Sequence, residues 1–282
     1  MRSRNYFLVV CLVAFSVTST YLVTSSFTTQ GARILQGTTD TEYQVAALLY
    51  MQKAGEYRAL AYQAFNIARW QLDADLDKKN VKKLPKADRN RPRAIMVDID
   101  ETLLDNSPAQ AYSVVHQIGF NLKDWYAWGE MRKAKPIPGA VDFINYATDH
   151  SVKVFFATNR DDVQKQATID NLKSVGFKDV TPENVMLRTE TSSKEPRRQL
   201  ILQKYRIVLS VGDNLDDHSV VFEHKPIADR FAEVDKAKDL FGKKYILLPN
   251  PVYGTWENAL YDYKNLSDAE KIERRRNALE LP

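Results

Sequence analysis

From residue 94 onward, short apolar runs alternate with amphipathic segments. Five runs are rich in β-branched or aromatic residues and predict buried strands; they cover residues 94–97, 152–157, 185–187, 207–211 and 245–248. Between them, apolar residues recur at helical spacing in residues 140–148, 162–175 and 196–205. Strands that alternate with helices indicate an α/β fold, an open, doubly wound parallel sheet with helices on both faces.

The region before the predicted sheet has a different pattern. Residues 40–71 carry apolar side chains at helical spacing and predict one or two amphipathic helices, which we assign to a small helical cap. Residues 73–93 are rich in lysine and contain two prolines, as is typical of a solvated connector. The expected segments are a leader (1–30), a helical segment with its connector (31–93), an α/β core with a small cap insertion near 106–136 (94–260), and a C-terminal helix (261–282).

The first thirty residues are typical of an export signal. Arg2 and Arg4 precede an apolar run over residues 6–17, and small polar residues follow it. We expect export to the periplasm or the outer cell surface with cleavage of the leader, although no Ala-x-Ala site is present and retention as a membrane anchor stays open. Cleavage would remove Cys11, the only cysteine, and would leave neither a disulfide nor a thiol nucleophile.

Composition narrows the classes of partner. Hydrophobic residues make up 44% of the chain, which is enough for a sizeable core. The formal net charge of +4 is small for 282 residues and argues against a nucleic-acid polymer as partner.

Acidic residues come directly or almost directly after two of the predicted strands. Asp98 and Asp100 come after residues 94–97, while Asp213 and Asp217 come after residues 207–211. The carboxyl ends of parallel strands meet at one edge of a sheet, and like charges held close together there are costly unless a cation neutralises them. Because Mg²⁺ prefers hard oxygen ligands, we predict that the two acidic strand ends share Mg²⁺ or a similar divalent cation.

Hydrogen-bond donors occupy the strand end between these two in the sequence. Thr158 and Asn159 follow residues 152–157, and Lys194 precedes the helix predicted for residues 196–205. A hydroxyl, an amide and an ammonium group suit phosphate oxygens. Each residue taken singly is more typical of a turn, a cap or the surface, so the order and spacing carry the prediction.

That order resembles the haloacid dehalogenase superfamily, whose motifs are Asp-x-Asp-x-Thr, a strand-ending Thr or Ser, a Lys, and Gly-Asp-x-x-x-Asp. All four occur in sequence between Asp98 and Asp217. The wider context is similar to the class C acid phosphatases and lipoprotein 5′-nucleotidases over about residues 40–260; the segments concerned are DIDETLLDNSPAQAY, ATNRDD, SSKEPRR, GDNLDD and LPNPVYGTWE.

The resemblance implies a reaction. The protein would be a Mg²⁺-dependent acid phosphatase or 5′-nucleotidase that hydrolyses phosphomonoesters such as nucleoside monophosphates, nicotinamide mononucleotide or aryl phosphates. Asp98 would be the nucleophile that forms an aspartyl-phosphate, and Asp100 would protonate the leaving oxygen and then activate water.

The resemblance also assigns the remaining site residues. The metal would be held by the Asp98 side chain, the Asp100 backbone carbonyl and the Asp213 side chain, with Asp217 orienting a metal-bound water and Asp216 facing solvent. The phosphoryl oxygens would be held by Thr158, the backbone amide of Asn159, and Lys194. Trp125 and Tyr253 would stack on a ring of the substrate, although aromatic residues of this kind are equally typical of a core or a lid.

The resemblance leaves four further points: lipidation, the oligomeric state, the preferred substrate and the pH optimum. Lipidation at Cys11 is not expected, because a Val stands where the lipoproteins have a small residue. The resemblance is compatible with a homodimer. The preferred phosphomonoester and the pH optimum are not set by the motifs.

The main alternative is a surface protein that keeps the fold, binds a ligand and has lost catalysis. The complete set of Asp98, Asp100, Lys194 and Asp213 argues against it. A histidine or zinc phosphatase is disfavoured because the chain has four histidines and no Arg-His-Gly motif.

Overall fold

The computed structural model describes residues 40–282. The predicted leader, Cys11 and residues 31–39 lie outside the described residues. No helix among residues 40–282 is long and apolar enough to cross a membrane.

A five-stranded parallel sheet forms the centre of the described chain, with the strand order β5-β4-β1-β6-β7. The strands are β1 (Arg93–Val97), β4 (Lys153–Ala157), β5 (Val185–Met186), β6 (Arg206–Gly212) and β7 (Tyr245–Leu247). All five coincide with the predicted apolar runs to within one residue at each end. The order places β1 between β4 and β6, so the loops that follow these three strands meet at one edge of the sheet.

Helices cover both faces of the sheet, which confirms the predicted α/β class. Ile95 and Val97 of β1 face a core that also contains Phe65 of α3 (Gly55–Leu76) and Phe143 of α8 (Ala140–Asp149). Met96 faces the opposite side and packs in a cluster with Ile201 of α10 (Glu195–Lys204). This alternation follows from the side-chain period of two in a strand.

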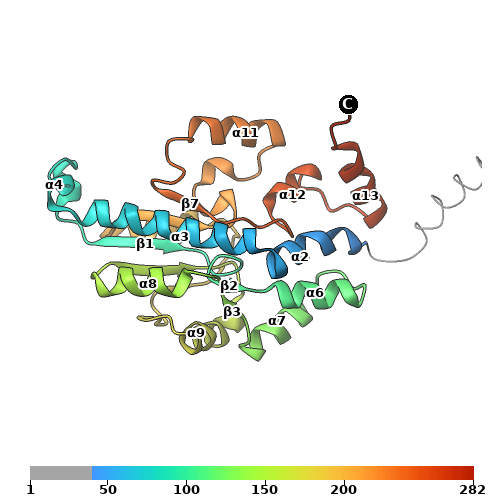
Figure 1. Cartoon of the computed structure of the whole chain (residues 1–282), viewed down its shortest axis with the longest axis horizontal. Helices are drawn as coiled ribbons and strands as arrows, with labels where there is room; N and C mark the ends of the chain where they lie inside the picture. The colour runs from blue at the N-terminus through green and yellow to red at the C-terminus, as the bar shows by residue number, and fades with distance from the viewer. Residues whose placement is uncertain (1–39) are drawn as a thin grey trace, which may run out of the picture. The chain divides into compact units, whose positions relative to one another are not determined.

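The remaining elements lie on either side of this centre (Figure 1). Toward one side lie α6 (Ser107–Val115), α7 (Leu122–Met131) and α9 (Lys165–Ser174), and toward the other α11 (Ile227–Lys236), α12 (Thr255–Leu260) and α13 (Asp268–Asn277). The other helices within residues 40–282 are α2 (Val45–Lys53) and the short elements η1 (Glu42–Gln44), α4 (Lys78–Val81), α5 (Lys86–Arg89), η2 (Asp162–Gln164), η3 (Leu215–Asp217) and η4 (Val220–Phe222).

The insertion between β1 and α8 begins and ends on a two-stranded antiparallel ribbon. Its strands are β2 (Leu104–Asp105) and β3 (Lys135–Pro136), with Leu104 opposite Pro136. Helices α6 and α7 lie between them, and α2 packs on α6. The ribbon holds both ends of the insertion beside the loop that follows β1, so α7 reaches the edge of the sheet where the acidic residues gather.

The charged connector is more ordered than the sequence pattern indicates. Helix α3 continues to Leu76 instead of ending near residue 71, because Leu72 is fully buried and Asp75 binds Arg93 and Arg206 at the start of β1 and β6. Helices α4 and α5 occupy half of the residues between α3 and β1.

Candidate active site

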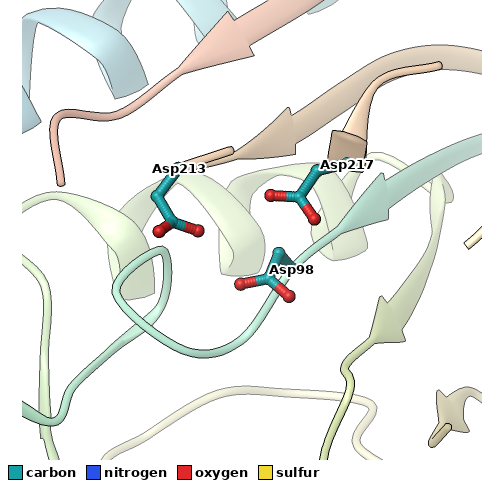
Figure 2. A group of neighbouring side chains, drawn as sticks. All are labelled: Asp98, Asp213 and Asp217. Atoms are coloured by element: carbon teal, nitrogen blue, oxygen red, sulfur yellow. The ribbon is translucent and has the colours of Figure 1, made fainter. Parts of the chain in front are cut away.

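Three carboxylates converge where β1 and β6 end. Asp98 follows β1, and its backbone N–H donates to the Val211 carbonyl of β6 at 2.9 Å. Asp213 and Asp217 follow β6. One oxygen from each of the three carboxylates lies within 4.8 Å of the others, and Figure 2 shows the three side chains turned toward one another.

The chain can bring Asp217 this close to the strand because residue 212 is glycine. A Cβ on Gly212 would lie 2.5 Å from both Cβ and Oδ2 of Asp217. Any side chain at this position would therefore displace the carboxylate.

Two of the carboxylates are held by fixed neighbours. Asp213 accepts hydrogen bonds from Asn250 Nδ2 at 2.8 Å and from the Thr102 hydroxyl at 3.3 Å. The Oδ2 of Asp217 accepts the backbone N–H of Asn214 at 3.0 Å. These bonds orient both side chains before any ligand binds.

Lys194 provides a positive charge inside the cluster. It stands at the N-cap of α10, is only 4% exposed, contacts Asp98, and lies 2.6 Å from Oδ1 of Asp217. Three carboxylates and one ammonium leave a formal charge of −3 + 1 = −2. One lysine therefore does not balance the cluster, whereas a divalent cation would.

The pKa values of the groups in this cluster reflect the same excess of negative charge. Burial raises the pKa of Asp98 well above its ordinary range; the charge of Lys194 lowers it in part, and those of Asp217 and Asp213 raise it further. Burial and the charge of Asp217 raise the pKa of Asp213 to about 8. For Lys194, burial lowers the pKa, but the carboxylates of Asp217 and Asp98 outweigh this and leave it raised.

The donor set fits a hard divalent cation. The cluster offers carboxylate oxygens, and its negative charge is stabilised by a cation of the Mg²⁺ type. Both oxygens of Asp217 already have partners, Lys194 and the Asn214 amide, so Asp98 and Asp213 are better placed to bind the ion directly.

Asp100 turns its side chain to a different set of partners. Its Oδ1 accepts from Asn106 Nδ2 at 2.9 Å and from the Arg160 guanidinium at 2.8 Å, while the Thr158 hydroxyl donates to Oδ2 at 3.0 Å. Asp100 is therefore beside the three-carboxylate cluster, with its carboxylate bound by side chains that follow β4 and β2.

The loop after β4 places Thr158 and Asn159 beside this group. Thr158 is fully buried, whereas Asn159 is exposed and its side-chain carbonyl accepts from Arg197 at 2.7 Å. Arg197 also donates to the Thr158 carbonyl at 2.5 Å, so a guanidinium from α10 braces the loop.

The two aromatic residues predicted to bind substrate both lie near Asp100. Trp125 of α7 is half-buried, and the Arg160 guanidinium carbon lies 5.4 Å from the centre of its ring. A cavity of about 290 Å³ between α6 and α7 is lined in part by this indole. Tyr253 donates its hydroxyl to the Glu101 carboxylate, next in sequence to Asp100.

Glu101 is buried and has a left-handed backbone with φ of 58°. Its carboxylate also accepts the Asn106 N–H at 2.9 Å, so contacts on both sides hold this turn. Burial and the charge of Asp100 raise the pKa of Glu101 to about 8. Burial, with the charge of Glu101, also raises the pKa of Tyr253 well above its ordinary value.

The prediction that Asp216 faces solvent is wrong. Its carboxylate lies 3.2 Å from the Arg230 guanidinium of α11 and accepts the Thr255 hydroxyl at 3.1 Å. This residue ties η3 to α11 and α12 instead of remaining free.

Several residues that orient the site were assigned no role from the sequence. Thr102 belongs to the first motif, and the others are Asn106, Arg160, Arg197 and Asn250. A signal existed for Arg160, which directly follows Thr158 and Asn159, and for Asn250, which follows the last predicted strand.

Comparisons with known proteins all find acid phosphatases. The family model described as HAD superfamily, subfamily IIIB (acid phosphatase) matches residues 16–256. The class C acid phosphatase of Bacillus anthracis is 41% identical; its crystal structure with tungstate bound gives a TM-score of 0.80 and covers 86% of this chain and 99% of that chain. A second structure of that phosphatase gives a TM-score of 0.79, with 86% and 98% covered.

A plant protein is also similar. Acid phosphatase 1 of Solanum lycopersicum is 30% identical over 131 residues, which cover 43% of this chain and 49% of the tomato protein. The match thus spans about half the length of this curated relative.

Proposed function

The chain belongs to subfamily IIIB of the HAD superfamily, the acid phosphatases, and we propose that it is a Mg²⁺-dependent phosphomonoester hydrolase that works through phosphorylation of Asp98. The observation that carries the proposal is the convergence of Asp98, Asp213 and Asp217 around one ammonium group, Lys194. Further support comes from the Bacillus anthracis relative, which binds tungstate in its crystal structure, because tungstate is a tetrahedral oxyanion like phosphate.

In the first step, an oxygen of Asp98 attacks phosphorus and the bond to the leaving oxygen breaks. Asp100 gives that oxygen a proton, so the alcohol or phenol leaves neutral. In the second step, Asp100 takes a proton from water, the water oxygen attacks phosphorus, and the bond to Asp98 breaks to release phosphate.

Lys194, the Thr158 hydroxyl and the Asn159 backbone amide hold the phosphoryl oxygens during both steps. Their positive charge and N–H or O–H dipoles stabilise the negative charge that spreads over these oxygens in the transition state. Lys194 suits this role because it is already held beside the nucleophile.

Mg²⁺ would be held by the side chains of Asp98 and Asp213 and by the Asp100 backbone carbonyl. Asp217 would support the site without binding the ion directly, because its two oxygens are bound by Lys194 and by the backbone amide of Asn214. When bound, the ion supplies positive charge to the phosphoryl oxygens.

The substrate is a phosphomonoester with a ring in its leaving group, such as a nucleoside monophosphate, nicotinamide mononucleotide or an aryl phosphate. Support for this comes from Trp125 of α7, whose ring lies beside the Arg160 guanidinium, and from Tyr253 in the loop after β7, which is bonded to Glu101, the residue next to Asp100.

The experiment measures phosphate release from adenosine 5′-monophosphate and 4-nitrophenyl phosphate with Mg²⁺ and with excess chelator. We expect turnover only with the cation, and a loss of at least about 10³-fold in Asp98→Asn because the nucleophile is removed. Asp149→Asn, which changes an exposed carboxylate outside the site, is the matched control. Full activity in chelator rejects the metal requirement, and no turnover at all favours a catalytically silent ligand-binding protein.

We also propose that the enzyme acts outside the cytoplasm, where the leader would send it, either free or attached to a membrane through its N-terminus, and as a homodimer. Support for export is the charge and apolar pattern of residues 1–30. Cell fractionation and N-terminal sequencing test the location and the cleavage, and light scattering tests the dimer.

A further inference from the structure

The guanidinium of Arg160 is buried and bound on all sides. The side chain is 1% exposed, and its NH1 donates to the Thr168 hydroxyl of α9 at 3.1 Å. Its NH2 donates to Asp100 Oδ1 at 2.8 Å and to Asn106 Oδ1 at 3.3 Å. A buried charge is costly unless it is paired in good geometry, so this orientation is strongly determined by its partners.

The two oxygens of Asp100 are bound unequally. Oδ1 accepts three strong bonds: Arg160 Nε at 3.0 Å, Arg160 NH2 at 2.8 Å, and Asn106 Nδ2 at 2.9 Å. Oδ2 accepts the Thr158 hydroxyl at 3.0 Å and a longer contact from Arg160 Nε at 3.3 Å. Oδ2 is therefore the oxygen with remaining capacity to carry a proton.

A Thr158 hydroxyl that binds substrate cannot also donate to Oδ2. A hydroxyl has one proton to donate, so under the proposed function Thr158 would release Asp100 on donating to a phosphoryl oxygen. Arg160 and Asn106 do not contact the nucleophile and keep Oδ1 fixed throughout.

We propose that Arg160 is a positioning residue. It holds Oδ1 of Asp100 so that Oδ2 of Asp100 faces the leaving oxygen of the phosphomonoester. The proposal rests on the proposed function. In the first step the leaving oxygen takes the electron pair of its bond to phosphorus together with the proton on Asp100 Oδ2, while Asp98 forms the new bond to phosphorus. In the second step Oδ2 takes a proton from water, the water oxygen forms a bond to phosphorus while the bond between Asp98 and phosphorus breaks, and the Asp100 acid is restored.

The consequence is a dependence on the leaving group. A poor leaving group such as phenolate needs protonation as its bond to phosphorus breaks, whereas 4-nitrophenolate is stable enough to leave with little help. Loss of the Arg160 contacts to Asp100 should therefore slow the hydrolysis of substrates with a poor leaving group selectively.

The test compares kcat/KM for phenyl phosphate and 4-nitrophenyl phosphate in the full-length wild-type protein, Arg160→Gln and Arg160→Lys. We expect kcat/KM for phenyl phosphate to fall about 10²-fold in Arg160→Gln and that for 4-nitrophenyl phosphate to fall less than about tenfold. Arg160→Lys keeps the positive charge but loses the paired N–H donors of the guanidinium. Its kcat/KM for phenyl phosphate should lie between those of the wild-type protein and Arg160→Gln. Arg132→Gln removes an arginine that binds a carboxylate at the surface and should leave the ratio unchanged.

The ratio of the two constants does not depend on the fraction of protein that is folded, because both substrates meet the same active molecules. An equal loss with both substrates in the two Arg160 variants, including no turnover with either, overturns the proposal. No turnover in the wild-type protein instead overturns the proposed function.

Discussion

The ammonium group of Lys194 lies 2.6 Å from Oδ1 of Asp217, at the end of the sheet where the strand of Asp98 stops. The same ammonium contacts Asp98, so one cation from α10 joins two carboxylates that come from different strands. In the proposed mechanism, this arrangement would present a positive charge and the nucleophile to the same phosphoryl group.

Replacing Lys194 with Met should slow the reaction more than it weakens the fold. We expect kcat to fall by roughly 10²–10³-fold, since a charge directed at the phosphoryl oxygens is lost. Lys204→Met, at the exposed C-terminal end of the same helix, is the control. Steady-state kinetics decide the matter, and a Lys194→Met enzyme within about threefold of wild type would remove this lysine from the mechanism.

Mg²⁺ should stabilise the wild-type fold and should do so much less in Asp213→Asn. An ion that binds only the folded state at 100 times its Kd adds about 2.7 kcal/mol to the free energy of unfolding. Without Mg²⁺ the variant should be at least as stable as wild type, because one charge of a repelling cluster is gone.

Thermal unfolding with and without Mg²⁺ measures both effects. Asp216→Asn is the matched control three positions along the same loop; it should lose stability with its Arg230 pair yet keep its response to Mg²⁺. An undiminished response in Asp213→Asn would show that the ion binds elsewhere.

Trp125→Ala should raise KM for a ring-bearing substrate selectively. Stacking of a base on an aromatic side chain is worth about 1–3 kcal/mol, so KM for adenosine 5′-monophosphate should rise roughly tenfold or more. Glycerol 2-phosphate, which has no ring, should be little affected. Trp70→Ala changes an exposed indole of α3 and serves as control. Equal effects on the two substrates would exclude stacking on Trp125.

The ion pairs of Asp75 should make stability depend on pH in the acid range. Burial raises the pKa of Asp75, but the hydrogen bonds and charges of Arg206 and Arg93 outweigh it and hold the pKa below its ordinary value. A lowered pKa in the folded state gives stability that is present above the unfolded pKa, about 3.9, and is lost as the pH falls through the folded value.

Asp75→Asn should therefore lose about 1–3 kcal/mol of unfolding free energy at pH 7, and the difference from wild type should shrink below about pH 4. Urea unfolding across this range measures it. Asp149→Asn breaks an exposed pair and should cost less than about 1 kcal/mol. A difference that grows as the pH falls would have the wrong sign.

The sheet was predictable because its strands are buried on both faces. Ile95, Met96 and Val97 are nearly inaccessible, so the strand appears in the sequence as an unbroken apolar run. The end of α3 was not predictable, since Asp75 looks like a solvated charge until Arg93 and Arg206, 18 and 131 residues away, are brought beside it.

The candidate site, like the fold, was predictable from the sequence only in part. The resemblance pointed to Asp98, Asp213, Asp217 and Lys194 because short motifs at strand ends carry them. The partners of the charged groups in and around the site come from distant positions: Arg230 reaches Asp216 only after α11 folds over η3, and Arg160 reaches Asp100 across the sheet edge. A single charged residue in sequence does not show which opposite charge it will meet.

Phosphorylation of Asp98 during turnover is the step on which the proposed mechanism depends. Rapid acid quenching of the enzyme with 4-nitrophenyl phosphate and Mg²⁺, followed by peptide mass spectrometry, detects this intermediate itself. We expect one phosphoryl group on the peptide that contains Asp98, attached at that residue, and none in Asp98→Asn. A phosphoryl group on another residue that persists in Asp98→Asn would contradict the mechanism.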